Sequence, residues 1–167
     1  SGVFTLCDED KLLHSAAHLL LEGEFDHGYR DLSDLDLLFR QYAPQGEPFW
    51  QSLGERAEDL GLGRVLYYAC RYCRLLLNSP VPDEVVIRLE RYAPGFALRQ
   101  LMDSLFTRAL LPTHPHCEDR LSGLARWLLY VRSHWLKMPL WILLPHLFHK
   151  AFITPFNRKD SAADDAL

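Results

Sequence analysis

The sequence has few cysteines, and those it has show no disulfide framework. Its 167 residues include four, Cys7, Cys70, Cys73 and Cys117, without the regular spacing of a small stapled domain. We therefore expect free, largely buried thiols in a cytoplasmic protein, because a reducing compartment is the default for such a chain. Cys70 and Cys73 have the spacing of half a zinc site or of a redox pair. Two small apolar side chains on one helix face explain that spacing equally well.

A strong net charge and an uninterrupted hydrophobic run are also missing. The net charge of −4 gives no reason to expect a nucleic-acid partner. The apolar region 126–152 carries a Lys, Arg or His in every window of about 20 residues, which argues against a transmembrane segment but leaves peripheral membrane contact open. Residues 1–63 hold 13 acids against 4 Lys and Arg, whereas residues 64–167 hold 9 against 14. Docking between the halves or onto another domain, or two solvated faces of opposite sign, would each explain this asymmetry.

Strand patterns are almost absent, and helix signals follow one another along the chain. Three acids at positions 8–10 suit the first turn of a helix, and Gly23 suits its end. The run 64–77 is apolar nearly all round, which predicts a central, buried helix. We predict an all-α fold, a single bundle of about eight helices. They are expected near residues 8–22, 29–42, 48–60, 64–77, 85–92, 96–111, 120–135 and 139–152.

The predicted domain covers residues 1–156, and the polar residues 157–167 are expected to be a disordered tail. The chain begins with Ser-Gly rather than Met, which is typical of a tag remnant, a processed chain or a piece of a longer protein.

A polar cluster stands out within the leucine-rich stretch 12–40. His14 and His18 are four residues apart, and Asp31 and Asp34 are three apart, so each pair shares a helix face. Imidazoles and carboxylates in this arrangement could bind a divalent metal, as in helical phosphohydrolases. The alternative is a buried hydrogen-bonded network that ties the first two helices together, with Arg30 or a histidine paired to Asp34.

Asp34 and Asp36 also imitate the Asp-x-Asp pair with which nucleotidyltransferases hold magnesium on a strand. Here the surrounding run predicts a helix, in which residues two apart point about 200° away from each other. The Gly-Ser turn that such sites use to hold phosphate is missing upstream. We therefore do not assign a magnesium site to this pair.

Aromatic and cationic residues alternate in the region 126–152. This face could line an anionic ligand groove, dock another domain or rest on a membrane surface, or it could be core with cations extending to solvent. No serine, histidine or cysteine nucleophile can be assigned, because no candidate has a catalytic partner at a sequence spacing that would place the two side chains together.

Four stretches together resemble the C-terminal part of a bacterial nucleotidyltransferase-like family of uncharacterised proteins. They cover residues 12–40, 49–72, 124–139 and 143–152. The family pattern resembles Leu-His-x-x-x-His, then Arg-Asp-Leu-x-Asp-Leu-Asp, then Tyr-x-Arg-Ser-His-Trp. The matching positions are His14, His18, Arg30, Asp31, Asp34, Asp36, Tyr130, Arg132, Ser133, His134 and Trp135.

The resemblance implies that an N-terminal catalytic domain with a strand-borne Asp-x-Asp motif is missing from this chain. It also implies magnesium and a nucleotide for the full-length family, with none held by this chain. In two-domain transferases of this kind the helical domain closes the cleft over the nucleotide or the acceptor. By that analogy the candidates for substrate or domain contact are Arg30, Arg132, His134 and Lys137.

The prediction is thus a helical C-terminal accessory domain that shapes the substrate pocket of a nucleotidyltransferase, without catalytic residues or a metal of its own. One alternative is a metal-dependent phosphohydrolase that uses His14, His18, Asp31 and Asp34. The other is a protein-interaction module that uses the aromatic and cationic face of residues 126–152.

Overall fold

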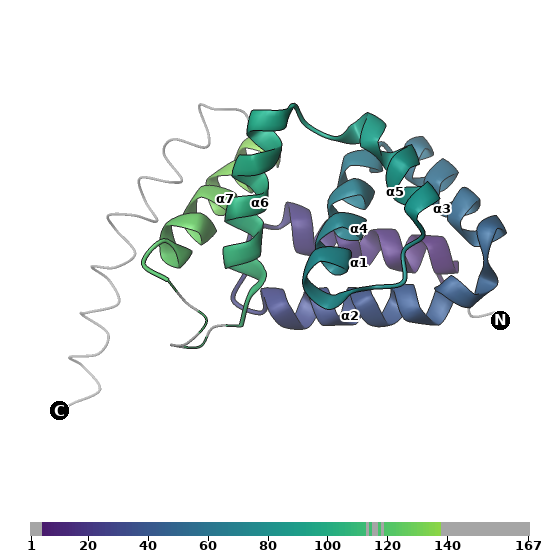
Figure 1. Cartoon of the computed structure of the whole chain (residues 1–167), viewed down its shortest axis with the longest axis horizontal. Helices are drawn as coiled ribbons and strands as arrows, with labels where there is room; N and C mark the ends of the chain where they lie inside the picture. The colour runs from purple at the N-terminus through teal and green to yellow at the C-terminus, as the bar shows by residue number, and fades with distance from the viewer. Residues whose placement is uncertain (1–4, 113, 115–116, 118, 138–167) are drawn as a thin grey trace.

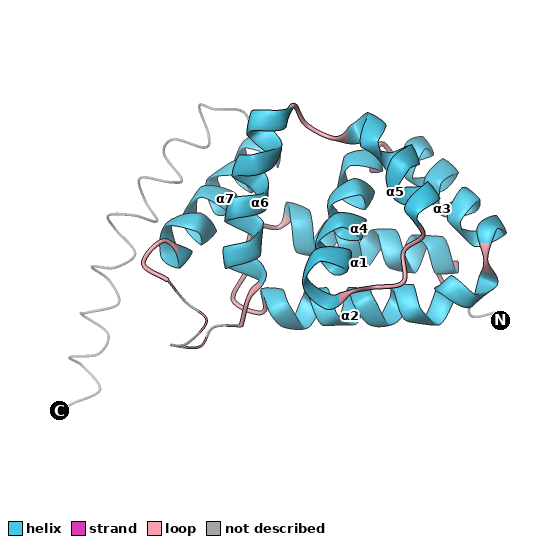
Figure 2. Ribbon diagram, in the orientation of Figure 1, coloured by secondary structure: helices cyan, strands magenta, loops and turns pink. Residues whose placement is uncertain are grey.

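A computed structural model describes residues 5–112, 114, 117 and 119–137 of the chain. Within these residues every regular element is a helix, which confirms the predicted all-α fold (Figure 1, Figure 2). The eighth predicted helix, 139–152, and the predicted domain end at residue 156 lie outside the described residues. The elements are α1 (Asp8–Leu21), α2 (Gly28–Tyr42), η1 (Ala43–Gln45), α3 (Glu47–Asp59), α4 (Gly63–Leu77), α5 (Asp83–Leu89), η2 (Glu90–Tyr92), α6 (Phe96–Leu110) and α7 (Ser122–Lys137).

Helix α4 lies at the centre of the bundle, as its apolar sequence predicts. Nine of its residues are buried, and α1, α2, α3 and α5 pack around it (Figure 1). Aromatic rings fill much of the space beside it: Tyr68 stacks on Tyr72, and both rings contact Phe106 of α6, at centroid distances of 5.5 and 4.8 Å. Such ring pairs stabilise a core beyond the area that they bury. We call Tyr68, Tyr72 and Phe106 the aromatic cluster.

Two close backbone approaches require glycine. Gly23 follows α1 with a φ of +79°, and a Cβ at this position would lie 2.6 Å from the Cβ of Ser133 in α7. At Gly63, the first residue of α4, an added Cβ would lie 2.5 Å from the ring of Tyr92. A larger residue would force either neighbour away, and at Gly23 the left-handed backbone adds a further penalty. These two positions therefore fix how closely α7 and η2 approach the bundle.

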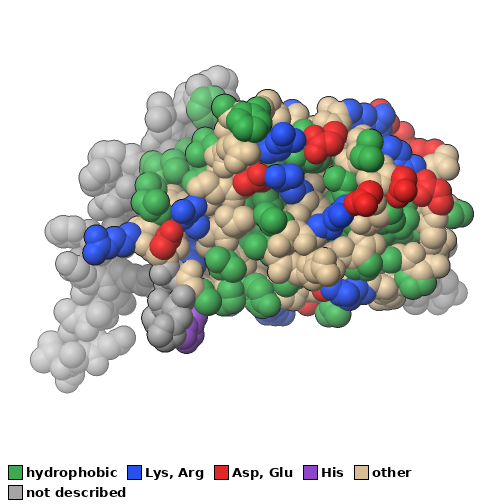
Figure 3. All heavy atoms as spheres, viewed as in Figure 1, with side chains coloured by type: hydrophobic (Ala, Val, Ile, Leu, Met, Phe, Trp, Pro, Cys, Tyr) green, Lys and Arg blue, Asp and Glu red, His purple; other side chains and the backbone are tan. Residues whose placement is uncertain are grey.

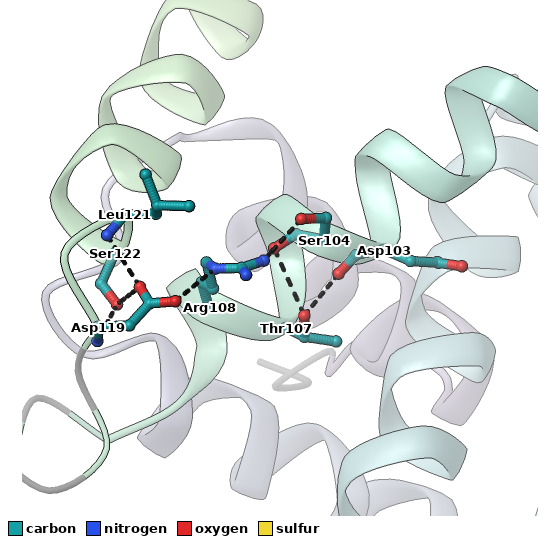
Figure 4. A network of polar contacts seen from close by, with 7 residues as sticks. All are labelled: Asp103, Ser104, Thr107, Arg108, Asp119, Leu121 and Ser122. Carbon is teal, nitrogen blue, oxygen red and sulfur yellow. Dashed lines mark hydrogen bonds and ion pairs between the residues drawn. The ribbon is translucent and has the colours of Figure 1, made fainter.

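Helices α6 and α7 form a pair at one end of the molecule, opposite the end where α3 and α5 lie (Figure 1). Figure 4 shows how the pair is joined. Arg108 of α6 donates from Nε to Asp119 Oδ2 at 2.8 Å, while Asp119 Oδ1 accepts from the hydroxyl of Ser122 at 2.9 Å and from the backbone N–H of Leu121 at 3.0 Å. Hydrogen bonds from Arg108 and Ser122 lower the pKa of Asp119. This carboxylate satisfies N–H and O–H donors at the start of α7.

Charged side chains of both signs lie next to one another over the α3 and α5 end (Figure 3). Arg88 of α5 pairs with Glu47 of α3, and Arg91 of η2 pairs with Glu58 of α3. These are exposed pairs, so each contributes little to stability. Their main effect is to neutralise the arginines of this surface.

Candidate functional site

The structure brings His14 and His18 of α1 together with Asp31 and Asp34 of α2. The four side chains line a shallow hollow of about 150 Å³. Both histidines and Asp34 are exposed, and His18 Nδ1 lies 3.3 Å from Glu22 Oε2 rather than next to an aspartate. The predicted buried network is therefore wrong. Its positions lie between the leucines of α1 and α2, and those leucines occupy the inward faces of both helices and leave the polar side chains outside.

Metal binding gains no support from this hollow. Within the described residues, no group of three or more histidine, cysteine, aspartate or glutamate side chains is placed to hold a metal ion. A zinc or magnesium site in a protein uses several converging ligands, usually with its own supporting hydrogen bonds. The geometry thus does not favour a phosphohydrolase that uses His14, His18, Asp31 and Asp34.

Asp34 and Asp36 point in different directions, as two residues two apart on a helix must. Asp34 is exposed on the hollow, whereas the side chain of Asp36 is only 14% exposed. Asp36 accepts hydrogen bonds from Ser79 Oγ at 2.5 Å and from Arg40 Nε at 2.9 Å. Both of its oxygens are therefore engaged with protein donors, and the pair does not present two free carboxylates to one magnesium ion.

The polar network that Asp36 does make links α2 to the end of α4. Arg40 also donates from Nη2 to the carbonyl oxygen of Leu77 at 3.1 Å, next to Asn78, which has a left-handed φ of +52°. A cation here satisfies a carbonyl that the helix leaves unpaired. The spacing of Asp36 and Arg40 was visible in the sequence, but Ser79 lies 43 residues from Asp36 and nothing in the sequence indicated it.

Arg132 is the predicted contact residue with the most unusual surroundings. It extends from α7 over the aromatic cluster, with Cζ 5.7 Å from the ring centroid of Tyr68 and 5.6 Å from that of Phe106. Its Nη1 donates to the carbonyl oxygen of Leu20, near the end of α1, at 3.4 Å. Burial lowers the pKa of Arg132, nearby tyrosines oppose this effect, and Arg64 adds to it as a like charge. Among the described residues Arg132 has no carboxylate partner.

Arg71 of α4 shares a carboxylate, that of Asp103, with Tyr72 of the aromatic cluster, and its charge is fully paired. Its Nε and Nη2 donate to the two oxygens of Asp103 at 2.8 and 2.6 Å, a bidentate arrangement. Tyr72 Oη also lies 3.4 Å from Asp103. The hydrogen bond to Asp103 raises the pKa of Arg71. Sequence reasoning missed this pair, because its members are 32 residues apart and belong to different helices.

The surroundings of the other three predicted contact residues give less support for a ligand contact. Arg30 is exposed near the start of α2, and its side chain makes no hydrogen bond, ion pair or ring contact within the described part of the chain. His134 lies on α7 with Nδ1 2.8 Å from the carbonyl oxygen of Tyr130, and its ring centroid is 3.9 Å from that of Tyr130. Lys137 is the last residue of α7, and its side chain lies outside the described residues.

Cys70 and Cys73 lie deep in α4, with 1% and 0% of their surface exposed. Burial raises the pKa of Cys70 to about 12 and also raises that of Cys73, so both thiols stay protonated near neutral pH. Within the described residues, the two thiols belong to no group of three or more side chains that could hold a metal ion. Their surroundings match the reading of two small apolar side chains, whereas Cys7 and Cys117 are exposed.

A second hollow, of about 300 Å³, lies between α3 and α5. Trp50, Leu66 and Leu89 contribute apolar surface to it, and Glu58 and Arg91 stand among its charged residues. Because Arg91 is paired with Glu58, the hollow shows no surplus of either charge to select a ligand.

A comparison with protein families bears on the first half of the chain. Residues 1–78 match the family model of uncharacterised nucleotidyltransferases. This nucleotidyltransferase-like region runs from the N-terminus to the end of α4 and so includes the histidine and aspartate hollow and the central helix. Helices α5, α6 and α7, with Arg132, lie beyond it. No curated protein and no solved structure matches the chain.

None of the helices in the described ranges combines the length and the apolar character needed to cross a bilayer. This agrees with the charged residues seen in the α7 part of the region 126–152.

Proposed function

We propose that this chain is a helical accessory domain of a nucleotidyltransferase, which helps to shape the substrate pocket and does not catalyse transfer by itself. The similarity of residues 1–78 to uncharacterised nucleotidyltransferases carries the proposal. The site geometry supports it. Asp34 and Asp36 diverge on a helix, and the described residues offer no converging carboxylates for magnesium. The catalytic metal would then belong to a separate catalytic domain, the proposed partner of this chain.

The proposed contact residues are Arg30, Arg132, His134 and Lys137, which would face the nucleotide, its acceptor or the catalytic domain. Arg132 has the best support of the four, because a cation that has no carboxylate partner among the described residues is suited to an anionic substrate. Likeness to a family of transferases by itself supports the general role and does not select these residues.

The test measures nucleotide binding and nucleotide transfer on the same preparation of the chain. Purified protein is mixed with magnesium and each of the four nucleoside triphosphates, and both the melting temperature and the release of pyrophosphate are recorded. We expect at least one nucleotide to raise the melting temperature, since a ligand at about 100 times its Kd stabilises by about 2.7 kcal/mol. No pyrophosphate should be released. Steady release by the chain alone, or no response to any nucleotide, would contradict the proposal.

A protein-interaction role for α7 is the second candidate, and one observation favours it. Several large apolar side chains of this helix are at least half exposed, among them Leu124, Trp127 and Trp135. Exposed apolar side chains gathered on one helix are typical of a protein interface. If α7 carries the function, Trp135→Ala should abolish partner binding while nucleotides leave the melting temperature of the wild type unchanged. The remainder of the face 126–152 lies outside the described residues.

A further inference from the structure

The charge of Arg132 is not neutralised by any carboxylate of the described residues. Its partners among the described residues are two aromatic rings and one neutral carbonyl oxygen, that of Leu20, at a long 3.4 Å. Removing a cation from water without an anionic partner is costly. Arg40, Arg56, Arg71, Arg74, Arg88, Arg91, Arg99 and Arg108 each pair with a carboxylate. Arg132 thus differs from most arginines of the chain, whose charges are paired with a carboxylate.

A second unpaired arginine lies near the same ring. Arg64, in the first turn of α4, is exposed and forms no ion pair in the described part of the chain. Both arginines lower the pKa of the Tyr68 phenol, against the larger effect of burial, and Arg64 also lowers that of Arg132. Arg64 precedes Tyr68 by four residues on α4, so the two side chains share one face of that helix, and Arg132 Cζ lies 5.7 Å from the centroid of the same ring. Asp103 also acts on the Tyr68 phenol, but both of its oxygens are held by Arg71. Among the described residues, therefore, no carboxylate pairs with either Arg64 or Arg132, which favours binding of an external anion.

Unpartnered hydroxyl groups occur at neighbouring residues. Tyr67 Oη and Ser133 Oγ are buried, and neither has a hydrogen-bond partner among the described residues. Tyr67 packs its ring 5.3 Å from that of Tyr68, and Ser133 directly follows Arg132. Buried hydroxyls normally have partners, so such groups call for an explanation. Ser133 packs against Gly23, so of these two residues only Tyr67 is shown to lie against Tyr68, and its free hydroxyl suits a polar ligand there.

We propose that Arg132 and Arg64 together bind the phosphate group of a ligand beside the ring of Tyr68. The planar guanidinium group matches the geometry of phosphate oxygens. Two guanidinium groups carry two positive charges, so they suit a doubly charged phosphate better than they suit a singly charged carboxylate. This inference rests on the proposed function in one respect only, namely that a nucleotide or its acceptor would supply the phosphate. Free pyrophosphate and a nucleoside triphosphate share the required chemistry, and the experiment separates these two sources.

The experiment measures binding to the full chain by calorimetry and by melting temperature, at constant ionic strength. The probes are pyrophosphate, ATP and, as a reference anion, chloride. We expect pyrophosphate and ATP, but not chloride, to raise the melting temperature of the wild type. Arg132→Met and Arg64→Met should each weaken binding of pyrophosphate at least tenfold. Arg91→Met is the matched control, because Arg91 is exposed and paired with Glu58 at the other end of the molecule, and it should bind like the wild type.

Stability separates this role from a purely structural one. If Arg132 only caps the end of α1 at Leu20, Arg132→Met will lower the melting temperature and leave pyrophosphate binding to the folded fraction unchanged, which would overturn the proposal. We expect the opposite, a melting temperature within a few degrees of the wild type and lost binding. Should Arg132→Met fail to fold, Arg64→Met decides, since Arg64 is exposed. Binding of pyrophosphate without ATP would keep the site and remove the nucleotidyltransferase function, whereas no binding of either probe would remove the site.

Discussion

Arg71 and Arg132 are both linked to the aromatic cluster, Arg71 through the carboxylate that it shares with Tyr72 and Arg132 by lying over two of the rings, but they differ in how their charges are compensated. Arg71, from α4, is held by both oxygens of Asp103, which also lies within 3.4 Å of Tyr72 Oη. Arg132, from α7, lies over Tyr68 and Phe106 with a carbonyl oxygen as its hydrogen-bond acceptor. A pair such as Arg71 and Asp103 orients α6 against α4. An arginine without such a partner contributes little to holding helices together, and its charge remains available to a ligand.

The same distinction separates the two polar groups of α2. Asp36 is largely buried and serves two donors, whereas Asp34 is exposed at the rim of a hollow that it shares with Asp31 and two histidines. The motif that dominates the sequence is therefore not the one that stabilises the fold. Internal pairing, rather than prominence in the sequence, identifies the groups on which stability depends.

The largest effect is expected from removing the partner of Arg71. Asp103→Ala leaves a partly buried arginine without its carboxylate, so the free energy of unfolding should fall by about 2–3 kcal/mol, somewhat less than for a fully buried pair. Urea denaturation measures this change. Asp83→Ala is the matched control, since Asp83 also pairs with an arginine of α4 but its side chain is 81% exposed, and it should cost less than about 0.5 kcal/mol. If both variants lose the same free energy of unfolding, the pairing of Arg71 with Asp103 stabilises the fold no more than an exposed ion pair does.

The next largest effect tests the comparison within α2. Asp36→Ala removes the acceptor for Ser79 and Arg40, and we expect it to reduce the free energy of unfolding by about 1–2 kcal/mol. Asp34→Ala, two residues away, should change it by less than about 0.5 kcal/mol. The two urea midpoints provide the measurement. A large loss for Asp34→Ala would restore the buried network predicted from the sequence.

A smaller effect should follow when the charge of Arg71 is kept but its geometry is changed. Arg71→Lys replaces a bidentate contact by a point charge, and about 1 kcal/mol should be lost. Thermal and urea unfolding of the variant both report this loss. Arg74→Lys serves as the control, because Arg74 makes a single hydrogen bond to the exposed Asp83. If neither substitution changes the free energy of unfolding, the bidentate geometry of Arg71 contributes nothing beyond its charge.

The smallest change in stability is expected at Arg132 itself. Arg132→Met exchanges two weak ring contacts and a long hydrogen bond for apolar packing, so the free energy of unfolding should move by less than about 1 kcal/mol in either direction. Arg71→Met, by contrast, leaves Asp103 unpaired and should cost about 2 kcal/mol or more. If Arg132→Met lowers the free energy of unfolding as much as Arg71→Met does, the two arginines do not differ in their contribution to stability.

Helix content and the central position of α4 could be predicted from the sequence, because both follow from local periodicity and from the unbroken apolar run of residues 64–77. The ends of a helix were also predictable where a glycine or a group of acids marks them, as at Gly23 and at residues 8–10. The divergence of Asp34 and Asp36 follows from the helical repeat alone.

Local sequence information did not decide which polar groups are buried. The leucines beside His14, His18 and Asp34 suggested burial of all of them, but a helix has two sides, and only the packing of α1 on α2 determines which side faces inward. The partners Asp36 with Ser79 and Arg71 with Asp103 are 43 and 32 residues apart. Such pairs depend on the path of the chain between helices, which no spacing rule contains. Arg132 became distinctive for the same reason: its place over Tyr68 and Phe106, without a carboxylate among the described residues, exists only after α4, α6 and α7 have come together.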